Sequence, residues 1–174
     1  EEGTAYATST NTDIYIFDLA TGKTENISID NKGYDTQPRF SPDGKSIAWL
    51  SMERAGFEAD KNRIVVLDLA TKTLKEITKD LDQSADEMIW SPDSKTIYFA
   101  SCTNAVHQLY AYAINAKTAN LVKITNGLTD MGAISLASDA KSTYLIATKT
   151  SLSRPAEIVK VDVLKGKIEN TYHY

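Results

Sequence analysis

The stretch FSPDGKSIAWLS, residues 40–51, decides the fold of this chain. A short apolar segment leads into Ser-Pro-Asp-Gly, and an apolar run follows at residues 47–50. Pro42 fixes φ for a tight turn, Asp43 supplies a side-chain acceptor, and Gly44 tolerates a positive φ. The run after the turn is rich in β-branched and aromatic residues, which is typical of a strand. The stretch therefore predicts two strands joined by a tight turn.

The same unit returns twice further along the chain. IWSPDSKTIYFAS occupies residues 89–101, and a degraded copy, LASDAKSTYLI, occupies residues 136–146. The turn aspartates Asp43, Asp93 and Asp139 are separated by 50 and then by 46 residues. Self-similarity at a period of this size indicates a repeat architecture.

A second motif repeats in phase with the first. It reads DIYIFDLATGK at residues 13–23 and RIVVLDLATKT at residues 63–73, and it continues at residues 108–118 and 157–167. Each copy consists of an apolar strand, a polar hairpin turn and a further short strand. Four strands per period, with turn residues between them, are typical of a β-propeller blade.

We therefore predict an all-β fold, a β-propeller segment of about four four-stranded antiparallel blades in a single domain over residues 1–174. The first blade is predicted to lack its innermost strand. Near-continuous apolar runs fit sheets that are covered on both faces, and no stretch has a helical stripe. The blades are predicted at about residues 4–30, 37–79, 87–126 and 133–170.

Charge and composition limit the classes of function. The formal net charge is −4 at pH 7, whereas nucleic-acid binding needs clustered Lys and Arg, so we expect no nucleic-acid partner. No apolar run approaches the roughly 18 residues that span a bilayer, so we expect no membrane partner. The single Cys102 is interpreted as a small hydrophobic residue at a strand end. A reactive thiol is the alternative, but no His or Lys signal lies beside it.

Catalytic and metal-binding motifs give little signal. There is no Gly-x-Ser-x-Gly elbow, and neither His has metal-ligand spacing. His107 is interpreted as an exposed polar residue at a loop end, with a general base as the alternative. The acidic run at residues 80–87 offers carboxylates for calcium but lacks the order of a calcium loop, so a solvated loop is favoured. We predict no catalytic residue, no metal and no cofactor in this chain.

The segment at residues 52–62 is the best functional candidate. It joins the second and third strands of the second predicted blade and is long for a hairpin loop, whereas shorter loops are predicted at residues 103–107 and 149–155. Its carboxylates, Asp60 among them, suit an amine, its guanidinium suits a carboxylate, and its phenyl ring offers an apolar wall. The alternative is a loop whose ion pairs pin it to the blade rim, although long loops on rigid scaffolds often carry binding groups. The candidate substrate-binding residues are Glu53, Arg54, Phe57 and Glu58.

These residues resemble those of a known family. FSPDGK at residues 40–45 and WSPDSK at residues 90–95 are similar to the PD40 (WD40-like) propeller repeat of the prolyl oligopeptidase (S9) family of serine peptidases and of TolB-like periplasmic proteins. WLSMERAGFEADK at residues 49–61 resembles the corresponding loop of dipeptidyl peptidase 5-type and acylaminoacyl peptidase-type members in Gram-negative bacteria. The resemblance covers the whole chain but only part of that architecture. Family members carry a larger propeller followed by a C-terminal α/β-hydrolase domain with the Ser/Asp/His triad.

The resemblance implies a non-catalytic N-terminal propeller segment of a secreted or periplasmic serine exopeptidase. Such a segment gates access and helps to position short peptides for the hydrolase domain, so we expect no enzymatic activity from this chain alone. Only Arg54 and Glu58 stand in a matching loop, and the contiguous glutamate pair of dipeptidyl peptidase IV is absent. The alternative is a TolB-like periplasmic propeller that binds protein partners without enzymatic activity.

The chain starts at Glu1 without an initiator Met, and we interpret it as a piece excised from a longer protein. A partial propeller leaves sheet faces open and at least one strand edge unpaired, and such edges pair readily with other chains. We therefore predict that the fragment self-associates through its blade edges, or that its units close on themselves.

Overall fold

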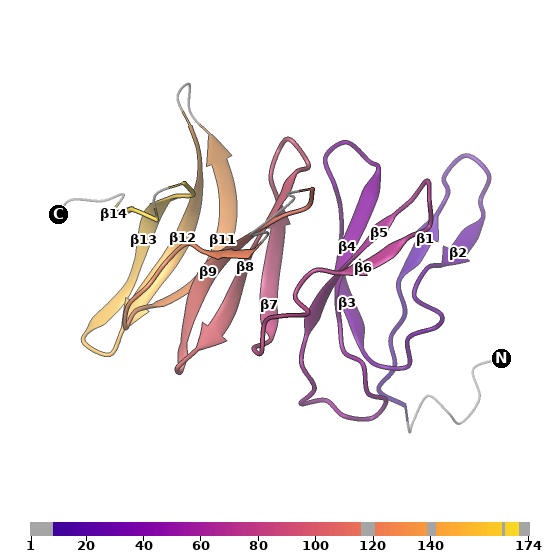
Figure 1. Ribbon diagram of the computed structural model, residues 1–174, viewed down its shortest axis with the longest axis horizontal. Coiled ribbons are helices and arrows are strands. Elements are labelled where there is room, and N and C mark those ends of the chain that lie inside the picture. Colours follow the sequence, from indigo (N-terminus) through magenta and orange to yellow (C-terminus); the bar gives the residue numbers. More distant parts are fainter. Residues whose placement is uncertain (1–8, 116–120, 139–141, 165, 171–174) are drawn as a thin grey trace. The chain divides into compact units, whose positions relative to one another are not determined.

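The computed structural model describes residues 9–115, 121–138, 142–164 and 166–170. In that part of the chain every regular element is a β-strand, and the strands form four antiparallel sheets (Figure 1). The prediction of an all-β propeller-type fold without helices is confirmed. The blade boundaries, the blade count and the missing innermost strand stay predictions. Residues 1–8, where the first blade is predicted to begin, lie outside the described part.

The strands fall into two compact units. The first unit, which comprises the residues up to Phe40 together with Lys45–Leu81, contains a two-stranded and a four-stranded sheet. The two-stranded sheet consists of β1 (Tyr15–Phe17) and β2 (Thr24–Asn26). The four-stranded sheet consists, in spatial order, of β3 (Asp35–Phe40), β4 (Ser46–Ser51), β5 (Arg63–Asp68) and β6 (Leu74–Glu76).

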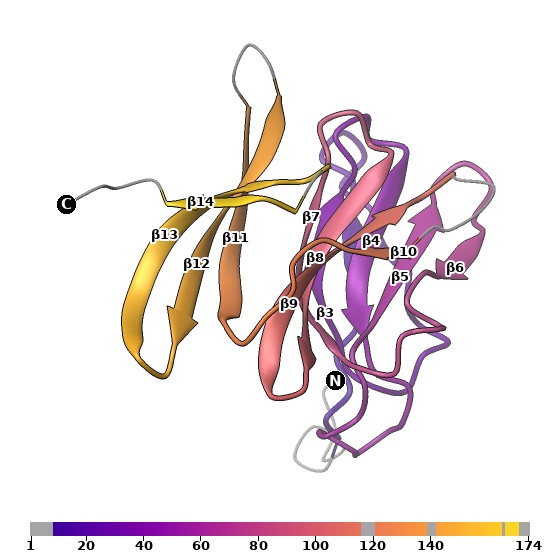
Figure 2. The same ribbon diagram turned by 60° about the vertical axis from the view of Figure 1, so that its left-hand side comes forward.

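The second unit comprises Ser41–Gly44 and the residues from Asp82 onward, and it contains two four-stranded sheets. The first of these consists of β7 (Ala85–Trp90), β8 (Thr96–Thr103), β9 (Val106–Ala113) and β10 (Leu121–Lys123). The other consists of β11 (Asp130–Ser138), β12 (Thr143–Ser151), β13 (Arg154–Asp162) and β14 (Ile168–Asn170), which lie side by side in Figure 2.

The repeated Ser-Pro-Asp turn has the same local structure in both described copies. The Ser41 hydroxyl donates to Asp43 Oδ1 at 2.7 Å, and the Ser91 hydroxyl donates to Asp93 Oδ1 at 2.6 Å. The hydrogen bond from Ser91 is also the main reason why the pKa of Asp93 is lowered. These aspartates therefore recur for turn formation, as predicted. The third copy, at Asp139, lies outside the described residues.

A buried hydroxyl closes the outer edge of three sheets in the same way. The backbone N–H groups of residues 14, 64 and 109 each donate to a hydroxyl at 2.9 Å, and all three hydroxyl-bearing residues are buried. The backbone carbonyl of each of these three residues accepts a hydrogen bond from the backbone N–H of the residue before the hydroxyl-bearing one. We call this arrangement the hydroxyl clasp, and its members are Ser28, Thr78 and Thr125.

The core of each unit follows from these strands. In the first unit β4 is buried at five successive residues, so the sheet is covered on both faces, as its apolar run predicts. In the second unit β11 lies next to β9 in Figures 1 and 2, and apolar side chains from both sheets form one cluster. Full burial of such a side chain contributes roughly 1.5–3 kcal/mol to folding. The most deeply buried members of the cluster include Leu109, Met131, Leu145, Val159 and Val161.

Two predicted loops are shorter than expected. β8 and β9 pair as far as Thr103 and Val106, so only Asn104 and Ala105 turn the chain, with φ of 54° and 63°. Positive φ at both central residues is the geometry of a tight hairpin turn, and Asn tolerates it. β12 and β13 likewise extend to Ser151 and Arg154, so the prediction of a loop over residues 149–155 was wrong.

Among the described copies of this turn in the second repeated motif, one is strained. Gly22 and Gly166 occupy a left-handed position with φ of 68° and 63°, and Lys72 occupies the equivalent position with φ of 55°. Residues with a Cβ atom adopt this region at a cost of about 1–2 kcal/mol. The Lys72 ammonium also pairs with Glu25 at 2.8 Å, but both side chains are more than half exposed. Such a pair contributes little and is screened by salt.

We predict that Lys72→Gly raises the free energy of unfolding by about 0.5 kcal/mol, because the released strain exceeds the greater flexibility of glycine in the unfolded chain. Urea unfolding in high salt, where the ion pair with Glu25 is screened, measures the effect. The reverse change, Gly22→Lys, is the matched control and is expected to destabilise. A stability loss in Lys72→Gly at high salt would contradict the strain argument.

Among the residues that the structure describes, none forms a helix with the length and hydropathy needed to cross a membrane.

Candidate functional site

The connection between β4 and β5, residues 52–62, is organised by one carboxylate. Asp60 Oδ2 accepts hydrogen bonds from the backbone N–H groups of Glu53, at 3.1 Å, and Arg54, at 2.8 Å. Asp60 Oδ1 accepts from Arg54 Nε at 3.0 Å and from Arg54 Nη2 at 2.7 Å. The Arg54 guanidinium therefore holds the pKa of Asp60 well below its ordinary value. The carboxylate stays ionised at working pH and ties the end of the loop to its start.

The sequence-predicted residues Arg54 and Phe57 contact each other within this loop. The Arg54 guanidinium carbon lies 4.1 Å from the centroid of the Phe57 ring, a cation–π geometry. Phe57 also begins a turn, because its carbonyl accepts from the backbone N–H of Asp60 at 3.0 Å. Two guanidinium nitrogens of Arg54 are thus already engaged by Asp60.

The two glutamates of the loop have different surroundings. The Glu53 carboxylate is 74% exposed and lies 3.4 Å from the guanidinium of Arg63, on β5. Glu58 is the second residue of the Phe57–Asp60 turn and lines a hollow of about 590 Å³. The structure thus separates the two carboxylates that the sequence grouped together. A binding role for any of the four predicted residues remains a prediction.

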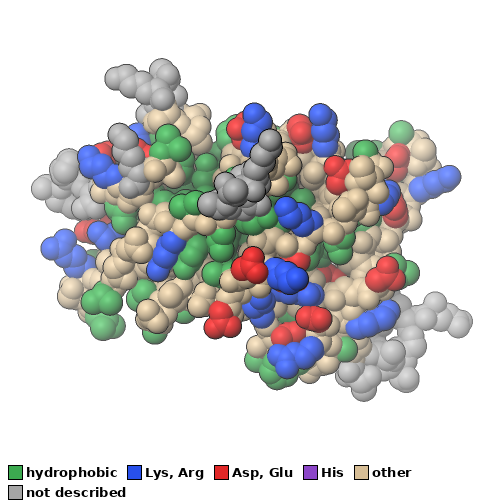
Figure 3. Space-filling view, in the orientation of Figure 1, with side chains coloured by type: hydrophobic (Ala, Val, Ile, Leu, Met, Phe, Trp, Pro, Cys, Tyr) green, Lys and Arg blue, Asp and Glu red, His purple; other side chains and the backbone are tan. Residues whose placement is uncertain are grey.

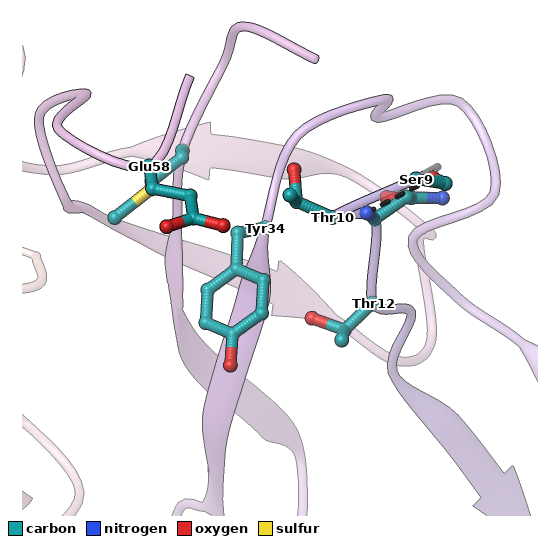
Figure 4. Close-up of a pocket in the computed structure, with 7 residues that line it drawn as sticks. Ser9, Thr10, Thr12, Tyr34 and Glu58 are labelled. Carbon is teal, nitrogen blue, oxygen red and sulfur yellow. Dashed lines mark hydrogen bonds between the residues drawn. The ribbon is translucent and has the colours of Figure 1, made fainter. Parts of the chain in front are cut away.

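The hollow lies between the β4–β5 connection and the segment before β1 (Figure 4). In Figure 4, the Glu58 carboxylate turns toward Tyr34, while Thr10 and Thr12 lie on the other side of the ring. The volume is within the range of small-molecule pockets. The described lining consists of Ser9, Thr10, Asn11, Thr12, Tyr34, Met52 and Glu58.

Backbone contacts hold the walls of the hollow together. Thr12 and Tyr34 form a parallel β-bridge, and the Thr12 hydroxyl donates to the carbonyl of Asp35 at 2.7 Å. On the other side, the Met52 N–H donates to the Tyr34 carbonyl at 2.9 Å. Tyr34 is thus fixed between two segments that are distant in sequence. Thr12 and Tyr34 could not be predicted from the sequence, because no motif marks either residue.

The described lining of the hollow carries charge of one sign only, which is negative. Among its described lining residues, Glu58 alone carries a charge, and the others offer hydroxyl, amide, thioether and aromatic groups. By contrast, basic and acidic side chains are interspersed over the face shown in Figure 3. A lone carboxylate beside hydroxyl acceptors suits a cationic group that has several N–H donors.

His107 differs from its sequence-based interpretation as an exposed loop residue. It is half-buried in β9, where its Nδ1 lies 2.8 Å from Asp130 and its Nε2 lies 3.1 Å from Asp86. The pKa of Asp130 is lowered, chiefly because the backbone N–H of His107 donates to its carboxylate. Asp86 belongs to β7, so the predicted acidic loop ends before it. Within the described ranges, no group of three His, Cys, Asp or Glu residues is placed to hold a metal ion.

Comparison with known proteins settles the family. A family model of the TolB beta propeller domain, PD40, matches residues 4–170. The chain belongs to this family. The resemblance drawn from the Ser-Pro-Asp repeats is thereby confirmed. This TolB-type propeller chain is 43% identical over 164 residues to a protein named dipeptidyl-peptidase 5 from Porphyromonas gingivalis. That match covers 94% of the chain and 23% of the relative, so the propeller chain spans about a quarter of the relative's length.

Two solved structures have the same fold as this TolB-type propeller chain. TolB from Acinetobacter baumannii superposes with a TM-score of 0.63 at 25% identity, over 91% of this chain and 37% of that one. The β-propeller domain of the Trilobed protease from Pyrococcus furiosus has a TM-score of 0.65 at 19% identity, over 93% of this chain and 43% of that one. The second likeness shows the fold alone.

Proposed function

We propose that this chain is the propeller segment of a larger dipeptidyl peptidase, and that its hollow receives the free ammonium group of a short peptide. The proposal of an ammonium site rests on a single observation, the lone carboxylate of Glu58 among the described residues that line a ligand-sized hollow. The similarity to relatives named dipeptidyl-peptidase 5 supports the proposal that the chain is part of a larger peptidase. In it, the propeller gates access to a hydrolase domain and helps to position peptides for cleavage.

The chemistry of a peptide N-terminus fits this lining. An ammonium group has three N–H donors and no acceptor, so it needs a carboxylate together with neutral oxygen acceptors. Glu58 supplies the charge, and Thr10 and Thr12 contribute hydroxyl groups to the same lining. Charge-assisted hydrogen bonds are about twice as strong as neutral ones, and partial removal from water strengthens them further. An N-blocked peptide lacks the positive charge and therefore cannot form these charge-assisted hydrogen bonds.

The test is Glu58→Gln in the full-length protein that carries this chain. For a dipeptide substrate with a free amine, we expect KM to rise and kcat/KM to fall by about tenfold or more, because a hydrogen bond to a charged group contributes about 1.5–3 kcal/mol. The N-acetylated form of the same peptide is expected to be unaffected. Michaelis–Menten kinetics on both substrates measure the difference.

Glu53→Gln is the matched control, because it removes the same charge from the same loop but outside the hollow. We expect it to leave both substrates unchanged. Equal losses on the free and blocked peptides in Glu58→Gln, or no loss on either, would remove the ammonium site from the proposal.

A TolB-like propeller that binds protein partners without catalysis is the second candidate, favoured by the 25% identity to TolB from Acinetobacter baumannii. The open reading frame that encodes the chain discriminates between the two. A Gly-x-Ser-x-Gly motif after a strand in a following domain supports the peptidase, and a stop codon at the end of the propeller supports the TolB-like protein. For either candidate we propose a periplasmic or secreted location, which the TolB-type fold supports.

A further inference from the structure

Glu58 stands on a part of the loop that has little support of its own. Residues 52–62 contain no strand, and only the hydrogen bond from Asp60 N–H to the Phe57 carbonyl closes the turn that carries Glu58. Gly56, just before the turn, has a φ of 71°, and a Cβ atom built on it would meet nothing within 4 Å. A turn flanked by glycine in open space needs other contacts to fix its direction.

Asp60 supplies those contacts from the last position of the turn. Its side chain is only 9% exposed, and each carboxylate oxygen accepts two hydrogen bonds from residues 53–54. Two of these bonds come from backbone N–H groups, so Asp60 fixes the backbone at the start of the loop and not only a side chain. The end of the Glu58 turn is thereby anchored next to the end of β4.

The first position of the turn is anchored through the same carboxylate. Asp60 orients the Arg54 guanidinium, and the guanidinium lies over the ring of Phe57. Both ends of the turn, Phe57 and Asp60, therefore depend on one ionised side chain. Arg54 is itself 63% exposed, so without Asp60 its cation would be free to swing toward other carboxylates of the loop.

We propose that Asp60 is a positioning residue for ligand binding: it directs the Glu58 carboxylate into the hollow and keeps the Arg54 cation away from it. This inference rests on the proposed function of Glu58. Asp60 does not touch the ligand, and it acts only through the loop. Its low pKa keeps this anchor ionised through the working pH range.

The kinetic test is Asp60→Asn in the full-length protein. Asn keeps the size of the side chain, but its NH₂ group cannot accept from the backbone N–H groups or from Arg54. We expect KM for the free-amine peptide to rise roughly tenfold with kcat unchanged, because a displaced binding group weakens binding strongly. The N-acetylated peptide is expected to keep its wild-type constants. Asp60→Glu, which restores the carboxylate, is expected to recover part of the loss.

A structural measurement accompanies the kinetics and does not depend on the ligand. Backbone amide hydrogen exchange at Glu53 and Arg54 is expected to accelerate at least tenfold in Asp60→Asn, because their acceptor is lost. Glu58→Gln is the control and is expected to leave both amides protected. Unchanged exchange at these amides in Asp60→Asn would overturn the inference.

The two proposals fail in different ways. If Glu58→Gln raises KM for the free-amine peptide but Asp60→Asn does not, the ammonium site stands and the positioning role of Asp60 is overturned. If Asp60→Asn lowers kcat on free and blocked peptides alike, the substitution impairs folding in general, and the inference is again overturned. If Glu58→Gln has no effect while Asp60→Asn accelerates exchange, the proposed function fails, and Asp60 positions the loop without a ligand role.

Discussion

Asp35→Ala is expected to lower the free energy of unfolding of the first unit by about 3 kcal/mol. Asp35 is 2% exposed, and its two carboxylate oxygens accept from Trp49 Nε1 at 2.9 Å and from Asn31 Nδ2 at 3.0 Å. Alanine leaves the buried indole N–H without an acceptor and removes one acceptor from the amide. Each buried donor left unsatisfied costs about 1–3 kcal/mol. Urea denaturation followed by tryptophan fluorescence measures the loss.

The next repeat along the chain supplies the matched control for this prediction. Asn31, Asp35 and Trp49 form a polar trio. Fifty residues further along the chain, at the equivalent positions of the next repeat, three apolar residues are buried. Both sheets have the same register at this place, with Asp35 opposite Ser51 and Ala85 opposite Ser101. The triple change Asn31→Leu, Asp35→Ala and Trp49→Phe copies this arrangement, and we expect it to recover most of the loss. No recovery would mean that the two sheets are not interchangeable here. The apolar trio is Leu81, Ala85 and Phe99.

Gly33→Ala is expected to destabilise the first unit by about 2–3 kcal/mol and to displace the start of the β4–β5 loop. A Cβ atom at Gly33 would lie 2.2 Å from the carbonyl oxygen of Met52 and 2.6 Å from its carbonyl carbon. These are backbone atoms that cannot rotate away, so the two segments must separate. Because Met52 lines the hollow, KM for the free-amine peptide is expected to rise as well. Thermal unfolding and the peptide assay measure the two effects.

Gly132→Ala is the control for this steric argument. The nearest atoms to a Cβ atom there are side-chain oxygens of Glu87 and Thr148, at 3.7 and 3.8 Å, which is ordinary van der Waals distance. Neither glycine has a left-handed φ, so the two substitutions differ in the room available for the Cβ atom and not in backbone strain. A loss in Gly33→Ala no larger than that in Gly132→Ala would contradict the prediction.

The sheets could be predicted from the sequence because their signals are local. The Ser-Pro-Asp turns at Asp43 and Asp93 lie between strands that are adjacent in the chain, so the turn residues and the apolar runs together specify each hairpin. Tight turns were harder to predict. The sequence suggested a loop around Pro155, whereas β13 starts at Arg154 and includes that proline. The hydroxyl clasp also has a sequence signal, the similar triplets Asn-Ile-Ser, Glu-Ile-Thr and Lys-Ile-Thr that end at residues 28, 78 and 125.

The candidate site could be predicted only in part, because its residues meet through tertiary contacts. Glu58 was found because it lies in a long charged loop, but Tyr34 and Thr12 come together only through a parallel bridge that spans 22 residues. The engagement of Arg54 by Asp60 depends on the path of the loop, which composition does not specify. His107 likewise meets Asp86 from β7 of its own sheet and Asp130 from β11 of the neighbouring sheet, and these contacts form only when the sheets assemble.

The hydroxyl clasp has a consequence for folding kinetics. Each clasp joins residues only 14 or 16 positions apart, so closing it requires a short loop and little loss of chain entropy. Contacts of such low sequence separation form early, on the microsecond timescale of hairpins. Each sheet that carries a clasp is therefore expected to behave as its own foldon, with its outer strands protected before the neighbouring sheets dock. We then expect the repeats to form in sequence order, one at a time, during synthesis.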